Sequence, residues 1–120
     1  MRKIEQAITA AIVTRSDAII GNTATCRVER EDGKPLLRVL LHGNHIATVG
    51  YDDSGKPCNA SGTLAGWDTR ITRSRLSLVA RALGDAAQSF GPCHRDGVPH
   101  VARRDGSYSP ILSDTEFFAL

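Results

Sequence analysis

The chain has 120 residues, of which 41% are hydrophobic and 23% are charged, and its formal net charge is +2. This length fits one domain with one core, and the composition excludes a disordered, collagen-like or disulfide-stapled protein. No apolar run approaches the roughly 20 residues that a membrane helix needs, so we expect no membrane partner and a cytoplasmic protein, where the three cysteines stay reduced.

Apolar residues recur at helical spacing near the N-terminus. Ile4, Ala7, Ile8, Ala11 and Ile12 follow one another at i, i+3, i+4, i+7 and i+8. This spacing lays a single apolar stripe along a helix. The pattern therefore predicts a first helix over about residues 2–15, packed on the sheet that follows.

Two turn signals predict an antiparallel meander after this helix. Asp32-Gly33 and Gly43-Asn44 each suit a two-residue turn in which both residues tolerate positive φ. Pairing outward from these turns places Val39 opposite Cys26 on one side and Thr48 on the other. The face predicted to point into the core comprises Ala24, Cys26, Val28, Leu37, Val39, Leu41, Ile46 and Thr48.

The opposite face of this meander mixes apolar and polar residues. Leu36, Leu40 and Val49 stand on it, which indicates partial cover by the C-terminal segment, by a second copy of the chain in a homodimer, or by another partner. The residues of this face that we expect to contact a partner are Arg38, His42, His45 and Tyr51.

The second half of the chain predicts a second helix and a short strand. Residues 52–62 are expected to form a loop, Thr63 to Trp67 a fourth strand with Trp67 in the core, and a helix capped by Thr69 or Thr72 runs to about Gln88. Residues 98–103 are expected to form an edge strand.

These elements define an α+β fold: an N-terminal helix, a three- to four-stranded antiparallel meander, a second helix, and a short C-terminal strand and tail. We expect one domain over residues 1–120. Its core spans residues 2–104, and residues 105–120 form an acidic and aromatic tail that is either docked or flexible.

Positive charge gathers in and after the second helix. Residues 69–104 hold seven arginines and two acidic residues, whereas residues 105–120 hold three acidic residues and no basic one. The helix dipole disfavours cations at a helix start, so arginines there suggest an anion such as a phosphate. The residues predicted to bind nucleic acid or another anion are Arg70, Thr72, Arg73, Ser74, Arg75, Arg81, Arg103 and Arg104.

An alternative counter-anion is the protein's own carboxylates. Arg75 falls toward the apolar side of its helix, so we expect it to reach past the first turn or to pair with a carboxylate. The available carboxylates are those of Asp68, Asp114 and Glu116.

Catalytic and metal-binding motifs are not evident in the sequence. It contains no glycine-rich phosphate loop, nucleophile elbow or paired-histidine zinc helix. His42 and His45 supply only two ligands across a turn, and the remaining candidates lack the close spacing of zinc motifs. Those candidates are Cys58, Cys93, His94 and His100. We expect no metal, no cofactor and a binding protein; an enzyme that uses His42, His45 or Cys93 is the weaker alternative.

Three segments carry a resemblance to a known family. Leu41 to Ala47 (LHGNHIA), Thr63 to Thr69 (TLAGWDT) and Thr72 to Leu76 (TRSRL) resemble motifs of small bacteriophage and prophage proteins, over residues 2–85. The resemblance implies a phage origin and a place in the host cytoplasm, without a mechanism. More loosely, the order helix, meander, helix is similar to that of double-stranded-RNA-binding domains, which present basic residues at the second helix.

Two functional hypotheses follow from the sequence. The first is a non-enzymatic phage accessory protein that binds nucleic acid through backbone phosphates at the basic helix start. The second is a phage anti-defence inhibitor, similar to anti-CRISPR proteins, that binds a host protein or nucleoprotein through the mixed sheet face and the aromatic tail.

Overall fold

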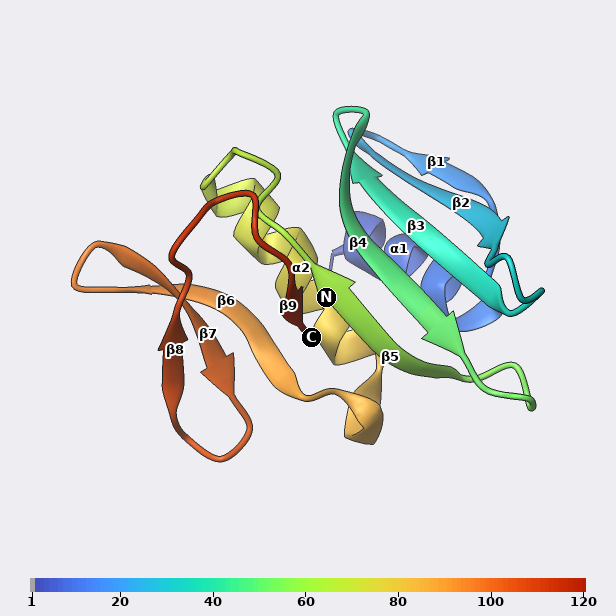
Figure 1. Cartoon of the computed structure of the whole chain (residues 1–120). Helices are drawn as coiled ribbons and strands as arrows, with labels where there is room; N and C mark the ends of the chain where they lie inside the picture. Colours follow the sequence, from blue (N-terminus) through green and yellow to red (C-terminus); the bar gives the residue numbers. More distant parts are fainter. Residues whose placement is uncertain (1) are drawn as a thin grey trace.

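The computed structural model describes residues 2–120 and has an α+β architecture with more strands than the sequence predicts (Figure 1). Two α-helices and one 3-10 helix accompany nine strands within these residues. The elements in chain order are α1 (Lys3–Thr14), β1 (Ala18–Ile20), β2 (Thr23–Glu29), β3 (Pro35–Leu41), β4 (Asn44–Tyr51), β5 (Pro57–Gly62), α2 (Arg70–Ala82), η1 (Gly84–Ala86), β6 (Ser89–Arg95), β7 (Val98–Arg103), β8 (Tyr108–Pro110) and β9 (Phe118–Ala119).

The strands form two antiparallel sheets on either side of α2. The larger sheet has the order β1-β2-β3-β4-β5-β9, and the smaller has the order β6-β7-β8. Both helices pack on one face of the larger sheet, α1 against β1 and β2 and α2 against β4 and β5, while β6 packs on α2 from the other direction (Figure 1). The second helix is thus enclosed between two sheets.

The core lies between the helices and the larger sheet. Ile8 and Ile12 of α1, Leu37 and Val39 of β3, and Leu76 of α2 are all fully buried. Each such side chain stabilises the fold by about 1.5 to 3 kcal/mol through its removal from water. The predicted first helix is confirmed, and Ile8, Ala11 and Ile12 of its apolar stripe face this core, whereas Ile4 is 41% exposed.

The predicted pairing of β2 with β3 is wrong by one residue. The connecting loop is longer than a two-residue turn, because the N–H of Arg30 donates to the carbonyl of Lys34 at 2.9 Å. Thr25 rather than Cys26 therefore pairs with Val39. Cys26 is exposed on the outer face and Thr25 is buried, because a shift of one residue turns every side chain of a strand over.

The turn between β3 and β4 also begins one residue earlier than predicted. His42 and Gly43, with φ of 51° and 79°, are its two central residues, and a bulge between Val39 and Leu40 shifts the register again. Val39 consequently pairs with Ala47. Leu37, Val39, Leu41 and Ile46 are core residues as predicted, whereas Thr48 lies on the outer face opposite Arg38.

The predictions beyond residue 51 need four further corrections. The expected loop at residues 52–62 contains β5, and the strand expected over residues 63–67 is irregular. Residues 98–103 form β7, the central strand of the smaller sheet rather than an edge. The helix expected to reach Gln88 ends at Ala82.

Residues 105–120 contribute strands to both sheets. They contribute β8 to the smaller sheet and β9 to the larger one. Leu120 is 1% exposed, its N–H donates to the carbonyl of Ala60 at 2.9 Å, and its carbonyl accepts the N–H groups of Gln88 and Ser89 at 2.8 and 3.0 Å. The last residue thereby connects β5 to the start of β6.

The contact between α2 and β6 depends on a glycine. Gly91 has φ of +92°, and a Cβ at this position would lie 2.7 Å from the Cα of Ser77. Only hydrogen fits between the two backbones here. This close approach brings the smaller sheet onto α2.

Replacing Gly91 by alanine is expected to force α2 and β6 apart. The matched control is Gly97→Ala, since Gly97 also has a positive φ (+76°) but its Cβ would meet nothing within 4 Å. We expect the control to lower the free energy of unfolding by about 1 to 2 kcal/mol, and Gly91→Ala to lower it by a further 1 to 3 kcal/mol or so. Urea denaturation followed by circular dichroism measures both, and equal losses would contradict the close approach.

Candidate functional site

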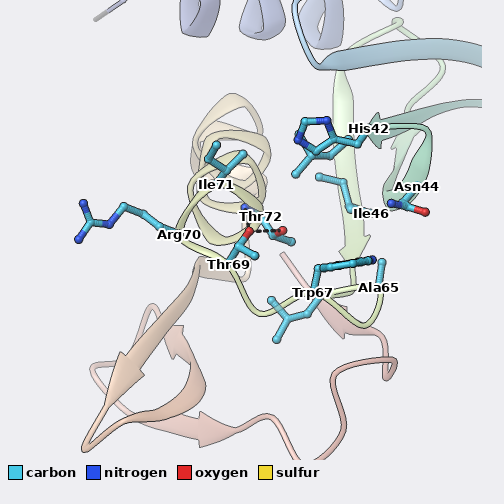
Figure 2. Close-up of a pocket in the computed structure, with 11 residues that line it drawn as sticks. His42, Asn44, Ile46, Ala65, Trp67, Thr69, Arg70, Ile71 and Thr72 are labelled. Atoms are coloured by element: carbon cyan, nitrogen blue, oxygen red, sulfur yellow. Dashed lines mark hydrogen bonds between the residues drawn. The ribbon is translucent and has the colours of Figure 1, made fainter.

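The start of α2 is capped as the sequence predicts. The Thr69 side chain accepts a hydrogen bond from the Thr72 N–H at 3.1 Å, and the two hydroxyl oxygens are 2.9 Å apart (Figure 2). Thr72 is buried, so its hydroxyl serves this cap and is not presented to a ligand. The Thr72 hydroxyl is therefore not at the surface, where a residue predicted to bind an anion would have to lie.

Two of the predicted anion-binding arginines are engaged within the protein. The Nη1 of Arg73 lies 2.6 Å from Asp68 Oδ1 and 3.0 Å from His94 Nε2. The Nε of Arg75 donates to the Thr23 hydroxyl at 3.0 Å, across to β2. Of the two alternatives for Arg75, pairing with a carboxylate is not what the structure has, because the side chain reaches out to a buried threonine of the sheet that supplies its acceptor.

Asp68 links the loop before α2 to the smaller sheet. Its Oδ2 lies 2.7 Å from His94 Nε2, and its Oδ1 receives Arg73. Desolvation opposes ionisation of Asp68, but the hydrogen bonds from His94 and Arg73 outweigh it and lower the pKa of the carboxyl below its usual value. The ionised carboxylate offsets the charge of Arg73.

A basic stripe remains on the outer side of α2. We define it as Arg70, Ser74 and Arg81 of the helix together with Arg104, all of which are exposed. The three helix positions share one side at about 100° per residue, and Arg70 and Arg81 are about 16 Å apart along the axis. Within residues 2–120, none of the three stripe arginines forms an ion pair.

Arg104 and Arg81 border one hollow at the C-terminal end of α2. The hollow has a volume of about 500 Å³ and is also lined by Ser77, Asp85 and Phe90. Arg104 donates from Nη1 to the carbonyl of Gly84 at 3.0 Å, and its guanidinium carbon lies 5.4 Å from the Phe90 ring centroid. We call this the Arg104 hollow.

Arg103 is directed to a different neighbour. It is exposed at the end of β7, and its Nε donates to the Ser109 hydroxyl of β8 at 2.6 Å. Its charge remains at the surface, but its side chain does not line the Arg104 hollow.

A larger apolar pocket lies beside Trp67, between the start of α2 and the turn that joins β3 to β4. Its volume is about 560 Å³, and the buried side chains of Leu41, Ile46 and Leu64 line it. Figure 2 shows Trp67 and His42 bordering this Trp67 pocket, whereas the Arg70 side chain extends away from it.

Trp67 is not the core residue that the sequence suggests. It is 61% exposed, in an irregular segment that follows Ala65 and Gly66, both at positive φ. A tryptophan between glycine and aspartate in a turn is the only local signal for this exposure. The pocket is also formed by the turn between β3 and β4, which is distant in sequence, so no local sequence pattern predicts it.

The residues predicted to contact a partner do not form one surface. Arg38 is exposed on the outer face of the larger sheet, and His42 is exposed in the turn. His45 is half-buried, with Nε2 2.7 Å from the Thr48 hydroxyl, and burial is the main cause that lowers its pKa. Its ring centroid lies 6.3 Å from that of Phe117, so the tail covers part of this face, as one of the sequence alternatives predicts.

Tyr51 is a correction to the predicted partner surface. It is 8% exposed, and its hydroxyl donates to the carbonyl of Ile12 in α1. The extra residue of β4 at Ile46 shifts the alternation of the strand and places Tyr51 on the core face. Burial raises its pKa to about 12, with a smaller opposing effect of Arg15.

The described residues show no assembled metal site. Cys93 and His100 pair across β6 and β7, while His94 turns to Asp68. Residues 2–120 contain no group of three or more His, Cys, Asp or Glu placed to hold a metal ion. No helix within the same residues is long and apolar enough to cross a membrane.

Sequence comparison assigns the chain to a class and then to a family. It is a bacteriophage protein, which confirms the phage origin that its motifs imply. Residues 1–118 match the Kyanoviridae Gp96 protein family, and the chain belongs to that family. The match extends past residue 85 and so includes the smaller sheet. No curated protein and no solved structure matches the chain.

Burial of the neutral Tyr51 phenol predicts a loss of stability in alkali. Because its pKa is raised from 10.0 to about 12, its contribution is complete below pH 10 and is lost as the pH rises through about 12. We expect Tyr51→Phe to lose less stability than the wild type over this interval in urea denaturation. Tyr108→Phe, at an exposed tyrosine, is the control and should behave as the wild type does. An identical alkaline loss in Tyr51→Phe would contradict this assignment.

Proposed function

We propose that this phage protein is a non-enzymatic protein that binds nucleic acid through the phosphates of its backbone. The binding surface is the basic stripe of Arg70, Ser74, Arg81 and Arg104. The observation that supports it best is that Arg70 and Arg81 on one side of α2, and Arg104 beside the end of the helix, are exposed without an ion pair within residues 2–120.

The dimensions of the stripe suit a regular polyanion. Arg70 and Arg81 are about 16 Å apart, roughly the length of five base pairs of a duplex at about 3.4 Å each. Exposed arginines can contact several successive phosphates, while the Ser74 hydroxyl between them adds a hydrogen-bond donor. Such contacts give affinity without reading the base sequence.

Three of the residues predicted to bind an anion make other contacts within the protein. Arg73 and Arg75 position the helix through Asp68 and Thr23, and Thr72 donates its N–H to the capping side chain of Thr69. Arg103 contributes charge from the neighbouring strand end. The proposed interface therefore comprises Arg70 and Ser74 near the start of α2 and Arg81 and Arg104 near its end, on either side of the point where Gly91 of β6 meets Ser77.

A second candidate function is an anti-defence inhibitor that binds a host protein or nucleoprotein. The Trp67 pocket favours it, because an exposed tryptophan beside Ile71 and above a buried apolar floor resembles the centre of a protein interface. In this function the pocket would receive an apolar side chain of the host protein.

The salt dependence of binding tests the first candidate. We expect log affinity for a fluorescent DNA oligonucleotide, measured by anisotropy, to fall linearly with log salt. Replacing Arg81 or Arg104 by glutamine should reduce the slope by about 1 each and weaken binding to all sequences alike. Arg75→Gln is the control, since Arg75 is bound to Thr23 and its loss should leave the slope unchanged.

Capture of host proteins tests the second candidate. In lysate treated with nuclease, the wild-type protein should retain a host protein, and Trp67→Ala should lose it because the pocket loses its exposed rim. A complex that disappears with nuclease treatment supports the first candidate instead. Arg81→Gln, which leaves the pocket intact, is the control in this experiment.

A further inference from the structure

We propose that the Arg104 hollow binds one unpaired nucleotide, with its base stacked on Phe90 and its phosphate on Arg81 and Arg104, so that the protein prefers single-stranded nucleic acid. This inference rests on the proposed nucleic-acid function and names the form of nucleic acid that the stripe takes. The position of Phe90 at the surface is the first observation that supports it.

Phe90 is the extra residue of a β-bulge. Ser89 pairs with Arg103 and Gly91 pairs with Ala102, so β6 has one residue more than β7 at this point. Bulges redirect side chains, and here Phe90 is turned outward and is 59% exposed.

The bulge is fixed by contacts on both sides of Phe90. The Ser89 hydroxyl accepts the N–H of Gly91 at 3.2 Å and donates to the carbonyl of Ala119 at 3.1 Å. Gly91 meets the backbone of Ser77 where no side chain would fit. The exposed ring therefore has a defined position beside α2 and is not on a mobile loop.

Two cations lie beside this ring. The guanidinium carbon of Arg104 lies over one face of the Phe90 ring, 5.4 Å from its centroid, so a base would stack on the other face, and Arg81 lines the same hollow. Its volume of about 500 Å³ falls in the range of small-ligand pockets, about 300 to 1,000 Å³. An aromatic face flanked by arginines is the combination that binds single strands, because the base stacks while the phosphate is neutralised.

A base can stack on Phe90 without leaving a helix only if it is unpaired. In a duplex both faces of a base are covered by its neighbours, so stacking on a protein ring requires the base to leave the helix. An unpaired base meets no such barrier. The duplex would then contact the stripe through phosphates alone, whereas a single strand would gain the stacking contact as well.

Asp85 also borders the hollow, and its carboxylate repels a phosphate. Its removal should therefore strengthen binding. We expect Asp85→Asn to bind both single strands and duplex more tightly at low salt, which is the opposite direction to the arginine variants.

The experiment compares an oligothymidylate of about 12 nucleotides with a duplex of the same length, by fluorescence anisotropy on the full chain. We expect the single strand to bind about tenfold more tightly. Phe90→Leu should remove this preference and leave the duplex affinity and its salt slope unchanged, while Phe90→Tyr should retain it. Phe117→Leu is the matched control, because Phe117 is 60% exposed on the other sheet.

The outcomes separate this inference from the proposed function. Binding to neither nucleic acid overturns both. Equal binding to the single strand and the duplex, or an equal loss for both in Phe90→Leu, overturns the single-strand inference and leaves backbone binding standing. Urea midpoints equal to that of the wild type show that each variant is folded.

Discussion

Burial of α2 from two sides is the constraint on which the rest of this structure depends. Leu76 and Val79 of α2 are buried in the core, and Ser77 meets Gly91 of β6 without an intervening side chain. A helix packed twice leaves only a narrow strip in water. Arg70 and Arg81 fall in that strip, whereas Arg73 and Arg75 fall at its margins and find acceptors on the neighbouring elements.

Because α2 lies between the two sheets, the sheets are connected to each other through α2 and through Leu120. The smaller sheet has few buried apolar side chains, of which Val101 is one, so it is held mainly through α2 and the chain end. Leu120 fills the space left by Gly62, where a Cβ would lie 2.9 Å from it. The surface that presents Phe90 and Arg104 is thus positioned by residues that lie far from it in sequence.

Local patterns predicted the first helix and the start of the second helix well, but predicted the sheet register poorly. The stripe from Ile4 to Ile12 and the cap at Thr69 depend on neighbours a few residues away, and both are present in the structure. One additional loop residue, Glu31, reversed the faces of β2, and the bulge opposite Val39 and Leu40 reversed those of β4 beyond Ile46. For the site, the exposed side of α2 was readable from its spacing, and Asp68, the carboxylate that Arg73 contacts, is only five residues away. The partner of Arg75 and the bulge at Phe90 arise from tertiary contacts that a single sequence does not encode locally.

Trp67 is the one tryptophan of the chain. Its position at the rim of a pocket determines what the intrinsic fluorescence of the protein reports. Its indole is largely in water in the folded protein, and it is in water in the unfolded chain as well. Intrinsic fluorescence is therefore a weak probe of unfolding here. The same indole becomes a selective probe of that pocket, since a shift of its emission to shorter wavelength would report one event, the covering of Trp67.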